Sequence, residues 1–325
     1  MMQVQTVETA NGTKRIPGAQ RSRFKELMRQ YRAHKYLLLM LIPGLAYYAL
    51  FHYGPIYGVQ LAFKNYRIVD GIWGSPWVGL KHFIYMFNGS PDFMNILANT
   101  IIISTYRLIF EFPMPILLAL ILNEIRFVRF KKISQTILYL PHFLSWVIMA
   151  GVLTTMLSPS IGIVNYVLGW FGVDPIYFLG DKAWFRPTLI ATNIWKEVGW
   201  DSILYMAAIV TVDTEQYEAA IIDGAKRWQQ IVYITIPSIM HVIAIMFLLT
   251  VGQIMDAGFD QIFNLYNPRV YEVSDIIDTY VYRIGLVSMR YDFATAVGLF
   301  KNVVGLILIL ATNYAVKKMG QEGLY

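Results

Sequence analysis

The sequence predicts an all-α integral membrane protein, and three features indicate this class. Of the 325 residues, 56% are apolar and only 15% are charged, whereas about 25% are charged in a typical soluble domain. The mean hydropathy is +0.47, so too few charged side chains are present to cover the apolar surface. Six apolar segments are long enough to cross a hydrocarbon core of about 30 Å, which takes roughly 20 helical residues.

The six predicted transmembrane helices follow one another after residue 35. They cover residues 36–63, 96–122, 133–157, 187–212, 236–257 and 293–316. Prolines or charges interrupt the first, second and fourth. Pro113 and Pro115 should bend the second helix, because proline lacks an N–H and collides with the preceding turn.

The basic residues predict that both termini are cytoplasmic. Residues 1–35 form a basic tail with eight Lys and Arg and no apolar core of a cleavable signal peptide. With this tail inside, the inner segments hold sixteen basic residues and the outer segments eight. Such an excess of Lys and Arg is typical of cytoplasmic loops. Residues 36–316 are then the transmembrane domain, and 317–325 a cytoplasmic C-terminal tail. Membrane lipid is the expected environment, and nucleic acid is not an expected partner.

The sequence offers no catalytic or metal site. It has no cysteine, so a disulfide, a thiolate nucleophile and a cysteine-based metal site are excluded. The five histidines show no metal-ligand spacing, and each is expected to be packing or interfacial. HExxH, GxSxG and the phosphate-binding G-x-x-x-x-G-K-[ST] are absent, which disfavours a membrane-embedded enzyme and places any ATP chemistry on another chain.

Residues 213–237, the inner loop between the fourth and fifth predicted helices, are the most informative stretch. Asp213 and Gln216 are spaced like a loose capping box at the start of a short helix, with Thr214 as an alternative cap. Gly224 adopts positive φ without steric cost, so this helix can end there. Pro237 is expected to begin the next membrane helix, because proline is tolerated in a first turn.

Seven residues of this loop resemble a known motif. They are Glu218, Ala219, Ala220, Gly224, Ile234, Ile236 and Pro237. Their spacing resembles the EAA loop of binding-protein-dependent ABC importer permeases, with Ile236 where that family usually has Leu. The resemblance implies the type I ABC importer architecture: a multi-pass permease domain over 36–316 in the bacterial cytoplasmic (inner) membrane, with a coupling loop at 213–237.

In that family the EAA loop forms a coupling helix in a groove of a cytoplasmic ATPase. The resemblance therefore implies that the ATPase is contacted by Glu218, Ala219, Ala220, Asp223 and Gly224. It also implies a second permease subunit in a heterodimer, two ATPase subunits that hold ATP and Mg²⁺, and an extracytoplasmic solute-binding protein. No cofactor is expected on this chain.

Other segments resemble the oligosaccharide permeases of the polysaccharide-import subgroup. These segments are 53–58, 62–64, 74–80, 139–143, 267–268 and 275–280. The subgroup includes permeases for uronate-containing oligosaccharides such as alginate fragments, and this chain resembles those too. The resemblance implies that the chain forms half of the translocation pathway for an oligosaccharide, with an acidic, alginate-like solute as the particular expectation.

Charged residues within spans are costly and usually face a cavity or a partner. The candidates for the translocation path are Trp195, Lys196, Glu197, Trp200, Asp201, Arg107, Asp256 and Lys301. Glu197 and Asp201 share one helix face, and carboxylates beside aromatic rings suit sugar binding. Packing against the second permease, or a position nearer the membrane interface, is an equal alternative for the 195–201 cluster. A structural ion pair with Glu111 is favoured for Arg107.

An ion-coupled secondary transporter is the alternative function. It would use the intramembrane carboxylates for protons or sodium and would transport without an ATPase. It leaves the loop at 213–237 unexplained.

Overall fold

The structure, a computed structural model, describes residues 34–318 and 320, and this part of the chain is all-α. Within it, Lys64 and Trp77 form one isolated antiparallel β-bridge. The chain divides into two compact units, Met1–Gly58 and Val59–Tyr325, which are described separately. Of the predicted tails, residues 1–33, 319 and 321–325 lie outside the described residues.

A long apolar helix begins the described chain. It consists of α2 (Lys35–Tyr48), the π-helical turn η1 (Ala49–Tyr53), α3 (Gly54–Ile56) and the 3-10 turn η2 (Tyr57–Phe63). Together they make 29 residues apolar enough to cross a membrane. The predicted helix over 36–63 is confirmed. None of the residues of α2 is buried.

Three π-helical turns each end two residues before a proline. They are η1 before Pro55, η3 (Arg107–Glu111) before Pro113, and η5 (Ile231–Thr235) before Pro237. Proline leaves the carbonyl four residues earlier without a donor and collides with it, and a wider turn accommodates both effects. Helices α6 (Phe93–Tyr106) and α7 (Pro113–Glu124) therefore continue through η3 as one 32-residue helix. Where Pro113 and Pro115 were expected to bend the helix, it instead forms this π-helical turn.

The third predicted span, over 133–157, is a bent pair of helices. Helix α8 (Val128–Tyr139) ends in the 3-10 turn η4 (Leu140–Phe143), and α9 (Trp146–Met156) leaves it at 106°. Ser145 restarts the helix by accepting a hydrogen bond from the N–H of Ile148 at 3.4 Å.

The fifth predicted span is also bent, by 63°, and the break falls at Ile239. Before it lie α13 (Arg227–Gln230), η5 and α14 (Ile236–Ser238); after it lies α15 (Met240–Gly252). The expectation that Pro237 begins the helix was wrong, because the helix already runs from Arg227 and η5 absorbs the proline.

Two further long helices complete the frame: α11 (Lys182–Val210) and α19 (Tyr291–Lys318). In the described part of the chain, three segments are long and apolar enough to span a membrane, or five if each bent pair is one span. Helix α11 does not meet this criterion, because Lys196, Glu197 and Asp201 interrupt its apolar stretch. It packs against α7 and α8, while α15 packs against α19.

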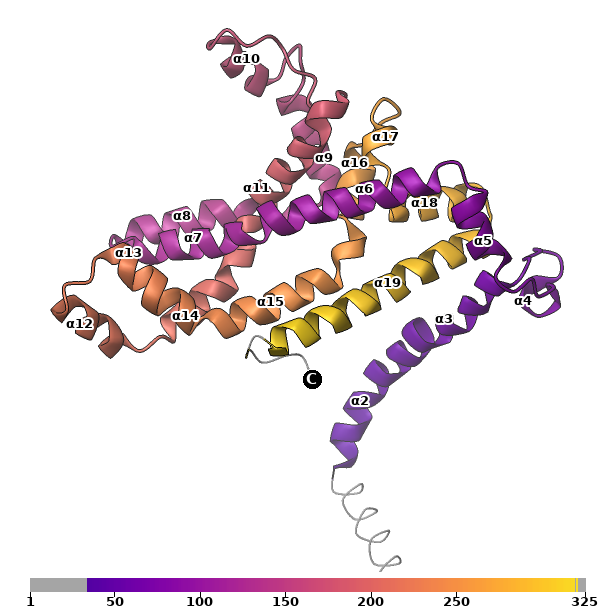
Figure 1. Cartoon of the computed structure of the whole chain (residues 1–325), viewed down its shortest axis with the longest axis horizontal. Coiled ribbons are helices and arrows are strands. Elements are labelled where there is room, and N and C mark those ends of the chain that lie inside the picture. Colours follow the sequence, from indigo (N-terminus) through magenta and orange to yellow (C-terminus); the bar gives the residue numbers. More distant parts are fainter. Residues whose placement is uncertain (1–33, 319, 321–325) are drawn as a thin grey trace, which may run out of the picture. The chain divides into compact units, whose positions relative to one another are not determined.

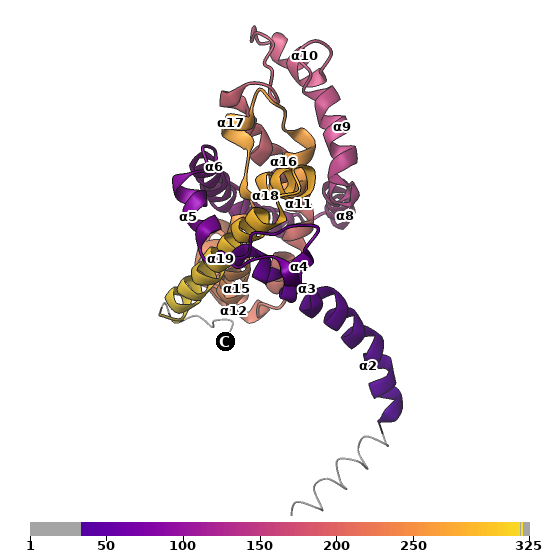
Figure 2. The ribbon, with the colours of Figure 1, turned by 90° about the vertical axis from the view of Figure 1, so that its right-hand side faces the viewer.

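Short helices connect the frame within the Val59–Tyr325 unit. They are α4 (Gly71–Gly74), α5 (Lys81–Asn88), α10 (Ile163–Gly169), α12 (Thr214–Ile222), η6 (Ile254–Asp256), α16 (Phe259–Leu265), α17 (Tyr271–Ser274), α18 (Ile277–Tyr282) and η7 (Arg283–Val287). In Figure 1, α12 lies at one end of this unit and α4 and α5 at the opposite end. Figure 2 shows α10 at the far end of α9, away from the other helices.

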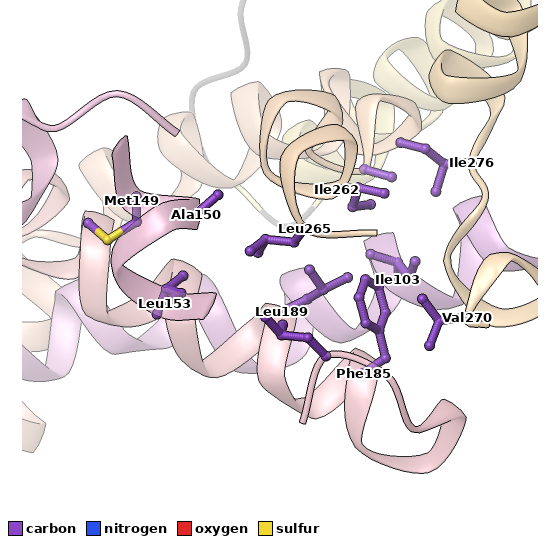
Figure 3. Packing of buried hydrophobic residues seen from close by; sticks show 12 residues of the cluster. Ile103, Met149, Ala150, Leu153, Phe185, Leu189, Ile262, Leu265, Val270 and Ile276 are labelled. Atoms are coloured by element: carbon purple, nitrogen blue, oxygen red, sulfur yellow. The ribbon is translucent and has the colours of Figure 1, made fainter. Parts of the chain in front are cut away.

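A buried apolar cluster packs α9 and α16 against α11 (Figure 3). Phe185 and Leu189 of α11 and Ile262 of α16 are fully buried, and Met149 and Leu153 of α9 join them. The cluster therefore holds α9 and α16 against the same helix, and both border the cavities described next.

Candidate coupling loop and translocation cavities

Helix α12 carries the EAA-like residues and is capped at its start by Asp213. The carboxylate of Asp213 accepts the N–H of Glu215 at 3.0 Å. Asp213, rather than the alternative Thr214, is therefore the N-cap.

Gly224 ends α12 in a Schellman motif. Its φ is +81°, and its N–H donates to the carbonyl of Ile221 at 3.0 Å. The N–H of Ala225 donates to the carbonyl of Ala220 at 2.8 Å, which is the second bond of that motif. A Cβ at position 224 would meet nothing within 4 Å. The requirement for glycine is therefore conformational rather than steric, and the predicted helix end is confirmed.

The loop that contains α12 is fixed on one side and exposed on the other. The hydroxyls of Tyr217 and Thr235 lie 2.9 Å apart, which ties α12 to η5. No residue of α12 is buried, and Ile221 and Ile222 are 58% and 86% exposed. Adjacent apolar side chains exposed on a short capped helix are typical of a docking surface.

Lys196 and Glu197 hold the bend between α8 and α9. The Lys196 ammonium donates to Glu197 at 2.5 Å and to the carbonyl of His142 at 3.1 Å. Glu197 lies 2.5 Å from His142 Nδ1, and the His142 ring stacks on Trp200 at 4.4 Å. The packing role expected for His142 is confirmed. Trp195, Lys196 and Trp200 are not among the residues that line the two larger cavities.

Lys301 is neutralised by two carboxylates. Its ammonium lies 2.7 and 2.8 Å from the two oxygens of Asp278 and also pairs with Asp256. The predicted residues Asp256 and Lys301 are thus brought together. Asp278 was missed as a site residue, since the sequence places it in an outer loop.

Two cavities lie between the helices, with volumes of about 890 Å³ and 540 Å³. The larger is bordered by α16, α18 and α19, and the smaller by η3, α11 and α15. Among the predicted path residues, Arg107 and Asp256 line both, and Glu197 and Asp201 line the smaller one. Lys301 lines a third space of about 260 Å³ beside Asp256.

Sequence reasoning missed three neutral residues beside Arg107. Asn193 donates to Glu111 Oε2 at 2.7 Å, Gln261 accepts from Arg107, and Gly258 lies against the guanidinium. Nothing in their local pattern distinguishes them from ordinary helix and loop residues, because only the fold brings them together. Within the described ranges, no group of three His, Asp or Glu side chains is arranged to hold a metal ion.

Several membrane-length apolar helices, cavities between them that charged residues help to line, and an exposed capped loop helix are features of a solute permease. The chain belongs to the family of binding-protein-dependent transport system inner membrane components, whose family model matches residues 112–319. It is a permease component of an ABC importer.

Two curated relatives from Bacillus subtilis strain 168 match almost the whole chain. The polygalacturonan/rhamnogalacturonan transport system permease protein YteP is 45% identical over 301 residues, which cover 93% of this chain and 94% of that protein. Protein LplB is 44% identical over 298 residues, which cover 92% and 93%.

A solved structure of a bacterial alginate ABC transporter in complex with an alginate pentasaccharide-bound periplasmic protein contains a similar chain. Its TM-score is 0.84 and its identity 44%, over 92% of this chain and 99% of that one. A second structure, of a bacterial ABC transporter involved in import of the acidic polysaccharide alginate, matches with a TM-score of 0.83 and 45% identity, over 90% and 99%.

Proposed function

We propose that this chain forms half of the pathway through which an ATP-driven importer takes up an acidic oligosaccharide. Support comes from the names of its relatives: one transports polygalacturonan or rhamnogalacturonan, and the similar solved transporters import alginate. These polymers share uronate carboxylates. The path would use the cavity-lining residues Arg107, Glu197, Asp201 and Asp256, with Lys301 beside them.

The topology we propose has six spans over residues 36–316 in the bacterial inner membrane, with the 1–35 and 317–325 tails and the 213–237 loop in the cytoplasm. In this arrangement the bent pairs α8–α9 and α13–α15 and the charged helix α11 each count as one span. Charged residues on α11 are tolerated in such a span because they pair with one another and face cavities.

A second permease subunit would supply the other half of the pathway. Support comes from the similar solved chains, which are parts of ABC transporters. A solute-binding protein would dock on the outer face. There, α10 and its flanks expose Ile161, Trp170 and Phe171 at 70–78%, an apolar patch that suits a protein partner.

ATP and Mg²⁺ would be held by two ATPase subunits, and α12 would couple them to the spans. The observation that carries this proposal is the geometry of α12: capped at both ends, tied to η5 through Tyr217, and exposed at Glu218 and Ala219. When the ATPases close, a rigid helix docked on them would move η5 and α15 with it.

The test is a charge reversal, Glu218→Lys, in the complex reconstituted with its ATPases and binding protein. We expect ATP hydrolysis stimulated by solute-loaded binding protein to fall at least fivefold, because a lysine replaces the carboxylate on the docked face of α12. Asp70→Lys, an exposed change of the same sign outside both the loop and the α10 region, serves as the control. Normal stimulation in Glu218→Lys would contradict the assignment of the coupling helix.

A further inference from the structure

The two larger cavities are divided by a wall of four residues. Arg107, Asn193, Asp256 and Gly258 line both cavities, of about 890 Å³ and 540 Å³. Each residue comes from a different segment: η3, α11, η6 and the turn before α16. Residues that line both cavities lie between them, so a path through both cavities passes this dividing wall.

The guanidinium of Arg107 occupies a well-formed site in the dividing wall. Its Nη2 donates to Gln261 Oε1. Gln261 is 1% exposed and is itself fixed from behind, because its Nε2 donates to the carbonyl of Leu189 at 2.8 Å and to Thr192 Oγ1 at 2.9 Å. On the other side, Gly258 leaves the room that the guanidinium fills, since any Cβ there would overlap it.

Arg107 also lies beside a second charged residue, Glu111, to which it is not hydrogen-bonded. Glu111 lies one turn along the same helix, and Arg107 Nη1 is 3.8 Å from Glu111 Oε2, too long for a hydrogen bond. Arg107 Nε and Glu111 Oε1 are both buried and have no hydrogen-bond partner in the part of the chain that the structure describes. A buried donor and acceptor left unpaired are unfavourable, and a shift of the guanidinium toward Glu111 would satisfy both.

The backbone on both sides of this contact departs from regular helix. Arg107 begins the π-helical turn η3, and such turns occur frequently at functional sites. Opposite it, Ala257 and Gly258 are consecutive left-handed residues with φ of +46° and +81°. A non-glycine residue at positive φ is strained and persists only where its surroundings hold it.

We propose that Arg107 is the gate in this chain's half of the pathway. Bound to Gln261, the guanidinium closes the dividing wall; paired with Glu111, it leaves the wall open. Gln261 and Gly258 are positioning residues for the closed state, and Glu111 holds the open state. The assignment of an outer and an inner side to the cavities rests on the proposed function.

The test uses single cysteines, which is possible because the chain has none of its own. Leu249→Cys reports on the smaller cavity and Leu286→Cys on the larger one, which we assign to the outer side; both side chains are exposed, by 45% and 63%. A membrane-impermeant maleimide is added from outside to cells that carry the whole complex, and labelling of this chain is followed over time.

In the resting complex we expect Leu249→Cys to be labelled at least tenfold more slowly than Leu286→Cys. Gln261→Ala removes the hydrogen-bond acceptor of Arg107, and Gly258→Ala puts a methyl group where the guanidinium lies. Each variant should therefore raise the labelling rate of Leu249→Cys at least fivefold. Glu111→Gln should lower it at least threefold during turnover with ATP and binding protein, because the open state loses its carboxylate.

Labelling of Leu286→Cys at the same rate in every background verifies assembly of each variant. Equal labelling of the two cysteines in the resting complex would overturn the gate. Unchanged labelling of Leu249→Cys in both Gln261→Ala and Gly258→Ala would also overturn the gate. An unchanged labelling rate of Leu249→Cys in Glu111→Gln would show that Glu111 does not hold the open state. The resting-state measurements need no solute, so failure to take up oligouronates would contradict the proposed function without deciding the gate.

Discussion

Single residues set the close approaches on which the helix frame depends. At Gly199 of α11, a Cβ would overlap the backbone carbonyl of Leu138 on α8. Glycine at this position therefore permits a helix contact that no other residue allows, as small residues commonly do between membrane helices.

We predict that Gly199→Ala destabilises the protein by about 1–3 kcal/mol, the usual cost of overpacking a tight contact. Thermal unfolding of the purified complex measures it. Gly151→Ala on α9 is the matched control, because a Cβ there meets nothing within 4 Å. An unfolding temperature of Gly199→Ala equal to that of the control would refute the close contact between α8 and α11.

Local residue chemistry was also what the sequence predicted best. The cap at Asp213 and the left-handed turn at Gly224 depend on neighbours within a few residues, so both follow from the printed chain. Gln261 and Gly258 could not be recognised as part of the dividing wall, because they acquire that position only when α16 folds onto η3 and α11.

At the scale of elements, the sequence predicted where helices lie but not where they bend. Composition and length locate the apolar segments, whereas the 106° bend between α8 and α9 depends on contacts from α11. Lys196 reaches the carbonyl of His142, and Glu197 reaches the His142 ring. Those contacts join residues more than fifty positions apart, which no local pattern reveals.

We predict that Lys196→Met lowers the stability of the complex by about 3 kcal/mol, because it removes the buried ammonium that binds both Glu197 and the carbonyl of His142. Lys182→Met, at the start of the same helix, is the matched control. Lys182 pairs with Glu272 at the surface, where an ion pair contributes little, so little change is expected. Both are measured by thermal unfolding, and equal shifts in the two variants would argue against a structural role for Lys196.

In the whole molecule, the two proposals link the coupling helix to the gate. In them, the α12 loop would receive movement, η5 and α15 would carry it toward the middle of the molecule, and the dividing wall around Arg107 would close one cavity from the other. Each connection is a contact of the structure: Tyr217 with Thr235, α15 leading into η6, and Asp256 and Gly258 in the wall. One continuous segment, residues 214–258, would thus couple movement to access.

The central claim is that ATP hydrolysis on partner subunits drives oligosaccharide uptake through this chain, and uptake into vesicles tests it most directly. The reconstituted complex is supplied with binding protein and a radiolabelled galacturonate or alginate pentasaccharide, with or without internal ATP. We predict uptake only with ATP and binding protein together, and no response to a proton or sodium gradient. Uptake driven by such a gradient in the absence of ATP would contradict the account and would identify an ion-coupled transporter instead.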